Sequence, residues 1–233
     1  MSKKIATTIM IVAVVCYGAY MWLGENDILP TEATVENVSD LGEIPEYNGN
    51  PYVEVNGNKV DHKGESTETY IKLSELDGLG RCGVAEAVVG KETLPTEKRG
   101  SIGMVRPSGW PEKVGNAKYD FVDGKYLWNR AHLLAFSLTG INADERNLIT
   151  GTRSMNAKYM WQFEEEVLDY INSTGNHVFY RVTPIFEGEN LVASGVHMEA
   201  KSIEDNDIEF SVYVFNVEPG VVINYADGSN HAE

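Results

Sequence analysis

Apolar and polar residues follow one another along the chain in patterns that predict its elements, and the first pattern is a long apolar run. Residues 5–23 contain 19 residues without a charge, about enough for a helix to cross a bilayer. Lys3 and Lys4 precede this run, and Tyr20 and Trp22 stand near its end, as in helices that are anchored in a membrane. We expect an uncleaved signal anchor here, with a removed signal peptide as the alternative.

The next segment, residues 24–46, is acidic and poor in apolar residues. It holds seven acidic residues and no basic one, and it contains Pro30 and Pro45. This composition cannot bury enough apolar surface to fold and favours a flexible tether. We therefore expect a signal segment (1–23), a tether and one folded domain (47–233), placed at the extracellular face of the membrane or secreted.

Within the expected domain, period-two alternation predicts β-strands. Tyr52–Val55 alternates, and the Asn56-Gly57 pair that follows is a frequent hairpin turn, so a return strand is expected directly after it. Residues 176–186 and 208–217 are rich in Val, Tyr and Phe, which favour strands. The ADGS stretch at 226–229 predicts a further turn near the C-terminus.

A further strand and a long helix are expected in the middle of the domain. Residues 125–138 are mostly apolar and predict a strand that carries His132 at its end. A helix is expected from Ser154 to about Ser173, with Ser154 or Thr152 as its cap. Its apolar residues recur every three or four positions: Met160, Phe163, Val167, Tyr170 and Ile171. These elements predict an α+β fold with a mixed, mostly antiparallel sheet.

Charge is distributed unevenly along the chain. The formal net charge is −16, which is unusual for a protein that binds a polyanion. Residues 98–160, however, carry ten Lys and Arg against five acidic residues, a net charge of +5, whereas the rest carries −21. A basic face on an acidic body can still attract nucleic acid. The alternative is that these cations are an ordinary solvated surface.

Three side chains in or next to this basic window suggest phosphodiester hydrolysis. His132 can take a proton from water near neutral pH. Asn156 can offer a neutral oxygen to Mg²⁺, which keeps several of its waters and needs few protein ligands. Glu164 follows eight residues later, about 80° around an ideal helix, and can support the same ion. Activated water beside a hard cation is a means of cutting a phosphodiester.

Two more residues are candidates for the same site. Arg130, two positions before His132, can contact a phosphate oxygen, and Asn147 can orient the His132 loop or the outer shell of a metal. Each candidate also has an ordinary structural interpretation, because a turn asparagine or a glutamate on a solvated helix face is common. The remaining histidines are interpreted in this ordinary way: His62, His177, His197 and His231.

Several motifs together resemble the DNA/RNA non-specific endonuclease family. These enzymes have a ββα-metal (His-Me finger) core, and the likeness is to the streptodornase and DNA-entry nuclease branch. It extends from about Leu76 to Tyr225. The motifs that carry it are NRAHLLAFSLTG (129–140), NLITGTRSMN (147–156), FEEEV (163–167), GSIGMVRPSGW (100–110), and the long stretches 176–202 and 215–225.

The resemblance implies a role for each candidate residue. The family signature Asp-Arg-Gly-His stands here as Asn129-Arg130-Ala131-His132, so Asn replaces Asp and Ala replaces Gly. It implies His132 as general base, Asn156 as metal ligand, and Glu164 and Asn147 as further site residues. Some relatives have an arginine one turn after the glutamate, where this chain has Leu168. A transition-state cation must then come from another arginine, and the candidates are Arg130, Arg106 and Arg99.

The same resemblance implies the cofactor and the substrate. It implies dependence on Mg²⁺ or Mn²⁺, DNA as substrate with RNA as a further one, and products with 5′-phosphate and 3′-hydroxyl ends. We expect a monomer that contacts the membrane through residues 5–23, and the existence of an inhibitor partner stays open. Two alternatives remain: a catalytically impaired surface protein that binds nucleic acid, and an adhesion domain on a stalk.

Overall fold

The computed structural model describes residues 37–38 and 41–233. The expected signal segment 1–23 and most of the expected tether lie outside the described residues, so both stay predictions. Among the residues that are described, no helix is long and apolar enough to cross a membrane. Two residues of the expected tether, Asn37 and Val38, pair with a strand of the main sheet.

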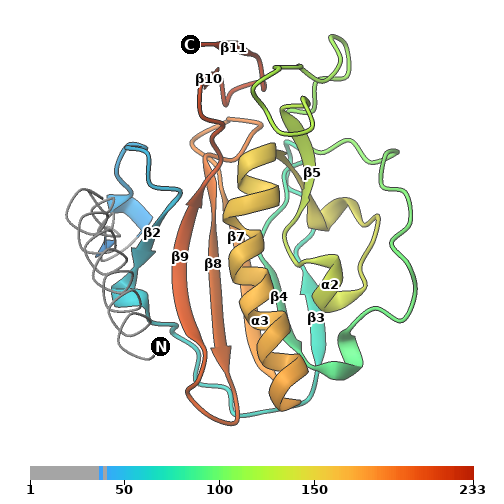
Figure 1. The fold of residues 1–233 in the computed structure, drawn as a ribbon, viewed down its shortest axis with the longest axis vertical. Coiled ribbons are helices and arrows are strands. Elements are labelled where there is room, and N and C mark those ends of the chain that lie inside the picture. The colour runs from blue at the N-terminus through green and yellow to red at the C-terminus, as the bar shows by residue number, and fades with distance from the viewer. Residues whose placement is uncertain (1–36, 39–40) are drawn as a thin grey trace, which may run out of the picture. The chain divides into compact units, whose positions relative to one another are not determined.

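A seven-stranded sheet is the framework of the molecule (Figure 1). Its strand order is β1-β2-β9-β8-β7-β4-β3, and every pair is antiparallel except β1 with β2. The strands are β1 (Asn37–Val38), β2 (Tyr52–Val55), β3 (Tyr70–Leu73), β4 (Ala85–Val89), β7 (Val178–Ile185), β8 (Gly195–Ser202) and β9 (Glu209–Phe215). The fold is α+β with a mostly antiparallel sheet, as the alternating residues predicted.

Two paired strands outside the main sheet and the helix that follows them form a compact ββα unit. β5 (Trp128–His132) and β6 (Leu148–Thr152) pair antiparallel, and α2 (Phe136–Thr139) lies in the connection between them. A π-helical turn (Met155–Tyr159) follows β6 and leads into α3 (Trp161–Thr174). The predicted strand therefore ends at His132, and the predicted helix ends within one residue of its expected end.

The core lies between α3 and one face of the sheet (Figure 1). Phe163 of α3 packs edge-on against Tyr52, with ring centroids 5.0 Å apart, and also contacts Phe210. The predicted apolar positions of the helix are all buried. Burial of this apolar stripe thus fixes α3 over the sheet.

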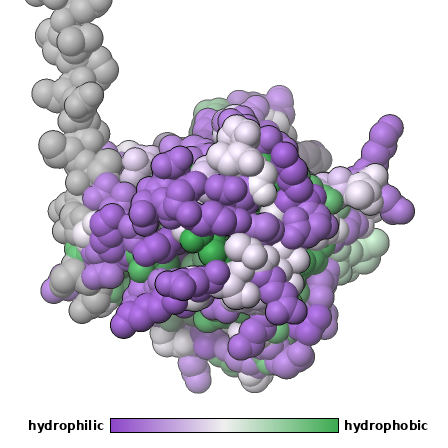
Figure 2. Space-filling model, turned by 90° about the horizontal axis from the view of Figure 1, so that it is seen from below, coloured by the Kyte–Doolittle hydropathy of each residue, from purple (hydrophilic) through white to green (hydrophobic). Residues whose placement is uncertain are grey.

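Seen from below, the surface is mostly hydrophilic and its apolar residues form only small separate patches (Figure 2).

The expected hairpin at Asn56-Gly57 is wrong. Residues 56–58 form a short 3₁₀ turn with positive φ, and no return strand follows directly after it in the described chain. β2 pairs with β9 instead, and the chain after the turn crosses the face of the sheet opposite α3, where His62 stacks on Phe179. Asn56 and Gly57 suit a hairpin turn, but β9 offers β2 the apolar partners Val212, Tyr213 and Val214, whereas residues 59–63 after the turn are mostly polar.

The C-terminal part adds a small ribbon beside the ββα unit. β10 (Val221–Ile223) and β11 (Asn230–Ala232) pair antiparallel. The predicted ADGS turn lies between them. Other short 3₁₀ turns are Leu41–Glu43, Lys91–Thr93 and Glu145–Asn147.

Candidate active site

His132 is the last residue of β5 and is buried, with both ring nitrogens engaged. Its Nε2 lies 2.9 Å from the backbone oxygen of Asn142, and its Nδ1 lies 3.1 Å from a guanidinium nitrogen of Arg99. A carbonyl only accepts and a guanidinium only donates. The ring is therefore the neutral tautomer that carries its proton on Nε2, and the lone pair of Nδ1 accepts a hydrogen bond from Arg99.

The surroundings of His132 keep the ring neutral. Burial lowers its pKa to about 4; the hydrogen bond to Asn142 opposes this shift, and the positive charge of Arg99 adds to it. An imidazole with this pKa is unprotonated at neutral pH. His132 is thus neutral at this pH, and Nδ1 is the ring nitrogen that can take a proton once Arg99 leaves it.

The helix that carries Asn156 and Glu164 is wider than an ideal α-helix at its start. Met160 N–H donates to the carbonyl of Met155 at 2.9 Å, an i→i+5 bond that makes the π-helical turn. Such a turn absorbs one extra residue, so the offset between positions 156 and 164 falls from about 80° to roughly 20–40°. The π-helical turn therefore moves the two side chains towards one face of the helix.

The start of this helix is held by two caps. Thr152 Oγ accepts the N–H of Met155 at 3.0 Å, so the second of the two expected capping residues is the one used. Ser154 instead donates its N–H and its hydroxyl to the carboxylate of Glu218, at 2.8 and 2.7 Å. Glu218 lies beyond β9, and a carboxylate is favourable at a helix N-terminus. These bonds tie the helix start to the main sheet.

Glu164 lies in an environment that opposes its charge. Burial raises its pKa to about 8, and the positive charge of Arg99 opposes the rise. The hydroxyl of Tyr180, on β7 beneath α3, is buried without a hydrogen-bond partner, and the Glu164 charge adds to burial in raising the Tyr180 pKa. Arg99 therefore acts electrostatically on both His132 and Glu164.

Asn156 and Glu164 are suited to hold a cation. Both residues are partly exposed, and neither side chain has a hydrogen bond or ion pair with any other described residue. No group of three or more His, Cys, Asp or Glu that could hold a metal occurs among residues 37–38 and 41–233. An amide oxygen with one carboxylate fits a hydrated Mg²⁺ rather than a fully protein-bound transition metal.

Asn147 is fully buried and holds the backbone that follows His132. Its amide Nδ2 donates to the carbonyl of Leu134, and its Oδ1 accepts the N–H of Leu134, both at 2.9 Å. Its own carbonyl accepts the N–H of Leu133. Both polar atoms of the side chain are thus used to fix the direction in which the chain leaves β5.

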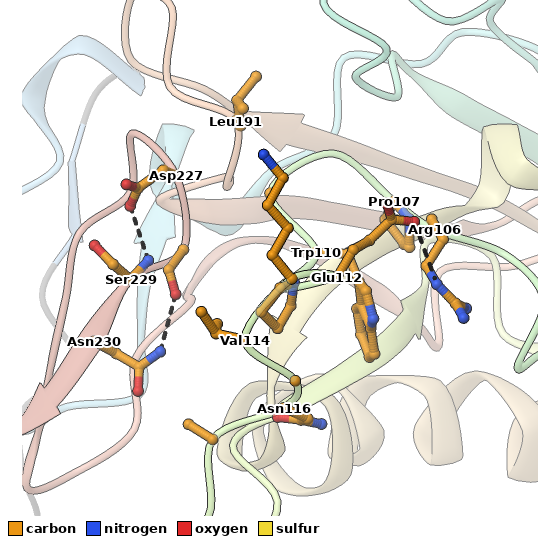
Figure 3. Close-up of a pocket in the computed structure, with 16 residues that line it drawn as sticks. Arg106, Pro107, Trp110, Glu112, Val114, Asn116, Leu191, Asp227, Ser229 and Asn230 are labelled. Carbon is orange, nitrogen blue, oxygen red and sulfur yellow. Dashed lines mark hydrogen bonds and ion pairs between the residues drawn. The ribbon is translucent and has the colours of Figure 1, made fainter.

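Arg130 lies on the same face of β5 as His132, because alternate strand residues share a face. It donates to the carbonyls of Val105 and Gly103 at 2.7 and 3.0 Å, and its guanidinium stacks 3.9 Å from the ring centre of Trp110. Trp110 also lines a large cleft (Figure 3). Arg130 therefore holds the 103–105 loop and Trp110, and a phosphate contact through it stays a prediction.

The signature residue Ala131 is accommodated by a glycine beside it. Ala131 is fully buried, and a Cβ added at Gly151 on β6 would lie 2.8 Å from the Ala131 methyl. The missing side chain at Gly151 thus leaves room for the Ala131 methyl. Asn129, two positions earlier on the same face of β5 as Ala131, is close to the Leu127 carbonyl at 3.5 Å.

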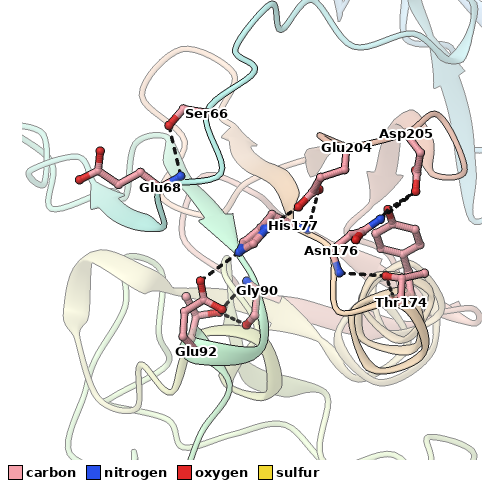
Figure 4. Close-up of polar contacts among 11 residues, drawn as sticks. Ser66, Glu68, Gly90, Glu92, Thr174, Asn176, His177, Glu204 and Asp205 are labelled. Carbon is pink, nitrogen blue, oxygen red and sulfur yellow. Dashed lines mark hydrogen bonds and ion pairs between the residues drawn. The ribbon is translucent and has the colours of Figure 1, made fainter.

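The other histidines lie away from this site. His177 is held between Glu92 and Glu204, at 3.0 and 2.6 Å (Figure 4). His197 contacts Ser211 on the neighbouring strand, and His62 stacks on Phe179. Among the described residues, His132 alone of the histidines sits in the basic window with Arg99.

The contact between Arg99 and His132 is the feature that the sequence did not predict. Arg99 is 33 positions earlier, in an exposed loop, and is one of the three arginines that the sequence offers as a transition-state cation. The sequence signal for it is only its place in the basic window. Loop conformation, which no periodicity describes, brings its guanidinium to Nδ1.

Comparisons with known proteins indicate the family of this chain and structures with a similar fold. A family model described as DNA/RNA non-specific endonuclease matches residues 58–204. The structure of the Sda1 nuclease with a bound zinc ion is 31% identical, with a TM-score of 0.62, and the match covers 70% of this chain and 81% of that one. NucA from Streptococcus agalactiae with a magnesium ion bound is 23% identical, with a TM-score of 0.68, over 83% and 92% of the two chains. A structure described as an extracellular nuclease is 17% identical, with a TM-score of 0.53, over 72% and 96%.

The family match and the structural neighbours support a nuclease function. The chain belongs to the DNA/RNA non-specific endonuclease family, because the family model spans more than half of it.

Proposed function

We propose that the protein is a metal-dependent endonuclease that hydrolyses phosphodiester bonds of DNA, and also of RNA, outside the cell. The observation that carries this proposal is the state of His132: a buried, neutral imidazole whose lone pair at Nδ1 accepts a hydrogen bond from Arg99. The family match and the likeness to extracellular nucleases support it.

The first step is proton transfer from water to Nδ1 of His132. The Asn142 carbonyl fixes the Nε2 proton and with it the ring orientation, since it accepts that proton at 2.9 Å. When Nδ1 takes a proton, the same carbonyl stabilises the imidazolium that forms. Asn147 holds the backbone at Leu133 and Leu134, and so keeps the ring at the end of β5.

Arg99 is the residue we assign to the scissile phosphate. Its guanidinium contacts Nδ1 at 3.1 Å in the free enzyme, where the attacking water would have to lie. The negative charge of a bound phosphate draws the guanidinium off Nδ1, which frees the base when substrate is present. Arg99 then neutralises charge on the pentavalent phosphate.

Asn156 and Glu164 are the residues that would hold Mg²⁺, with Mn²⁺ as a substitute. Both offer oxygen atoms that no other described residue engages. When bound, the cation would neutralise the leaving oxygen and the phosphate. Burial raises the Glu164 pKa to about 8 and so favours the protonated form. The positive charge of a nearby cation would oppose this shift and favour the carboxylate.

The test is His132→Ala with supercoiled plasmid and Mg²⁺. We expect nicking to fall by about 10²–10⁴-fold, because the general base is lost. His231→Ala, an exposed histidine on β11, is the matched control and should keep full activity. Circular dichroism checks that both variants are folded. Undiminished nicking by the folded His132→Ala protein would refute the assignment, and nicking that persists in EDTA would refute the metal. Binding of plasmid without any nicking by the native enzyme would instead favour the impaired binding protein.

A further inference from the structure

A large cleft lies beside the ββα unit, between two segments that are far apart in sequence. One wall is the loop 106–117 and the other is the turn 227–230, and the space between them is about 950 Å³. Figure 3 shows Asp227, Ser229 and Asn230 on one side and Trp110 with Arg106 on the other. This volume is in the range of sites that hold a small ligand.

The two walls are held together by a close approach of glycines. Gly109 and Gly228 both have positive φ, and a Cβ at Gly228 would lie 2.5 Å from the carbonyl oxygen of Gly109. A Cβ at Gly109 would overlap the Val192 side chain. Only glycine allows both the backbone conformation and the contact. The cleft is therefore preformed rather than a gap between mobile loops.

One aromatic side chain links this cleft to the catalytic strand. Trp110 is half-buried and lines the cleft, and the guanidinium of Arg130 stacks on its ring. Arg130 and His132 share one face of β5, roughly 6–7 Å apart along the strand. The Trp110 ring thus lies within a few nucleotides of a bond cut at His132, given a rise of about 3.4 Å per nucleotide.

The two walls of the cleft differ in charge. Arg106 and Lys113 are on the wall of Trp110, with Arg106 also 3.4 Å from Glu112, and Asp227 is on the other wall. Because Arg106 is paired with Glu112 on the same wall, a phosphate is attracted mainly to Lys113 and is repelled by Asp227. A base stacks on an indole whatever its identity, which suits an enzyme without sequence preference.

We infer that this cleft binds one unpaired nucleotide of the substrate strand, next to the scissile bond, with its base stacked on Trp110. This inference rests on the proposed nuclease function. A paired base is already stacked in its duplex and cannot enter, so single-stranded nucleic acid is the substrate class that gains from the cleft.

The experiment uses a single-stranded oligonucleotide with one cleavable phosphodiester, all other linkages being made resistant. An abasic residue is placed in turn at the three positions on each side of that bond, and kcat/KM is measured with Mg²⁺. For the native enzyme we expect a loss of roughly 5- to 150-fold at one position, the effect of removing one base–aromatic stack. Trp110→Leu should lower kcat/KM for the intact oligonucleotide and show no further loss at that position.

Two variants separate stacking from general damage. Trp110→Phe keeps an aromatic ring and should keep the abasic effect. Trp161→Leu removes an exposed tryptophan of α3 outside the cleft and should leave the effect unchanged. Because each ratio compares two substrates on one enzyme, a general loss of activity cancels.

The outcomes are distinguishable. If the native enzyme cuts the oligonucleotide but no abasic position matters, the cleft inference fails and the nuclease assignment stands. An abasic effect of equal size in Trp110→Leu also overturns it. If the intact oligonucleotide is not cut although the same enzyme nicks plasmid, the cleft inference fails and the nuclease assignment stands. If neither substrate is cut, the proposed function itself fails. The scan of the native enzyme decides the matter even if Trp110→Leu does not fold.

Discussion

At the scale of one residue, the fold makes the ionised form of Glu164 unfavourable. The residue is partly exposed, but the protein around its carboxyl removes enough water to raise its pKa to about 8, so its charged form is unfavourable in the fold. Buried ionisable groups of this kind cluster at functional sites, because the cost is recovered when a ligand binds. Burial also disfavours the charged form of His132, but for an imidazole this lowers the pKa instead of raising it.

The first residue-scale prediction concerns Glu164→Gln in the metal-free enzyme. The pKa of Glu164 is raised to about 8, so between its ordinary value and 8 the folded state holds more protons than the unfolded state. Stability is therefore lost as pH rises through this window. Gln does not ionise, and we expect the variant to be more stable than the native protein at pH 9 by on the order of 2 kcal/mol, with little difference at pH 4.

Urea unfolding in EDTA at the two pH values measures this difference. Added Mg²⁺ should stabilise the native protein at pH 9 and leave Glu164→Gln unchanged. A variant that differs from the native protein equally at both pH values, or is stabilised equally by Mg²⁺, would contradict the role of Glu164.

At the scale of secondary-structure elements, contacts between residues just outside neighbouring strands stabilise the framework around the site. His177 precedes β7 and bridges Glu92, in the 3₁₀ turn after β4, to Glu204, in the turn after β8 (Figure 4). The turn that contains Glu92 is also where the loop carrying Arg99 begins, and Thr93 in it donates to the Leu138 carbonyl at 2.7 Å. The contact thus stabilises the base of that loop.

The prediction at this scale is a pH-dependent contribution of His177. Hydrogen bonds to Glu204 and Glu92 raise its pKa, so its stabilising effect is complete below the ordinary value and is lost as pH rises through the raised one. We expect His177→Gln to lower the free energy of unfolding by about 1 kcal/mol at pH 5.5 and by less at pH 9. His231→Gln serves as the control, and an equal loss for His177→Gln at both pH values would argue against the ionic contact.

For the molecule as a whole, the uneven distribution of charge along the chain determines how a strongly acidic protein can bind a polyanion. The net charge is −16, yet the stretch that forms the ββα unit and the loops around it is basic. Attraction of substrate then depends on a few local cations and is sensitive to salt.

The prediction for the whole molecule uses Lys158, an exposed residue in the π-helical turn beside Asn156. For Lys158→Ala, the log–log plot of kcat/KM for DNA against salt should be shallower by about 1 unit. Lys72→Ala, on the edge strand β3, is the matched control and should leave the slope unchanged. Identical slopes for both variants would show that the basic window is an ordinary solvated surface.

The sequence by itself determined several of the elements and the family of the chain. Alternation predicted β2, β7 and β9, and the helical spacing predicted α3, because burying an apolar stripe depends on local periodicity. Residue types and spacing, together with the family motifs, indicated His132, Asn156 and Glu164, and their catalytic roles stay proposals.

Only the tertiary structure decided which groups meet. β2 pairs with β9, near the far end of the chain, instead of forming the expected hairpin, and an i→i+5 bond brings positions 156 and 164 towards one face. The tautomer of His132 depends on a carbonyl and a loop arginine from two other segments. The cleft at Trp110 exists because Gly109 and Gly228 touch. Such contacts follow from long-range packing and loop conformation, which leave no periodic trace in the sequence.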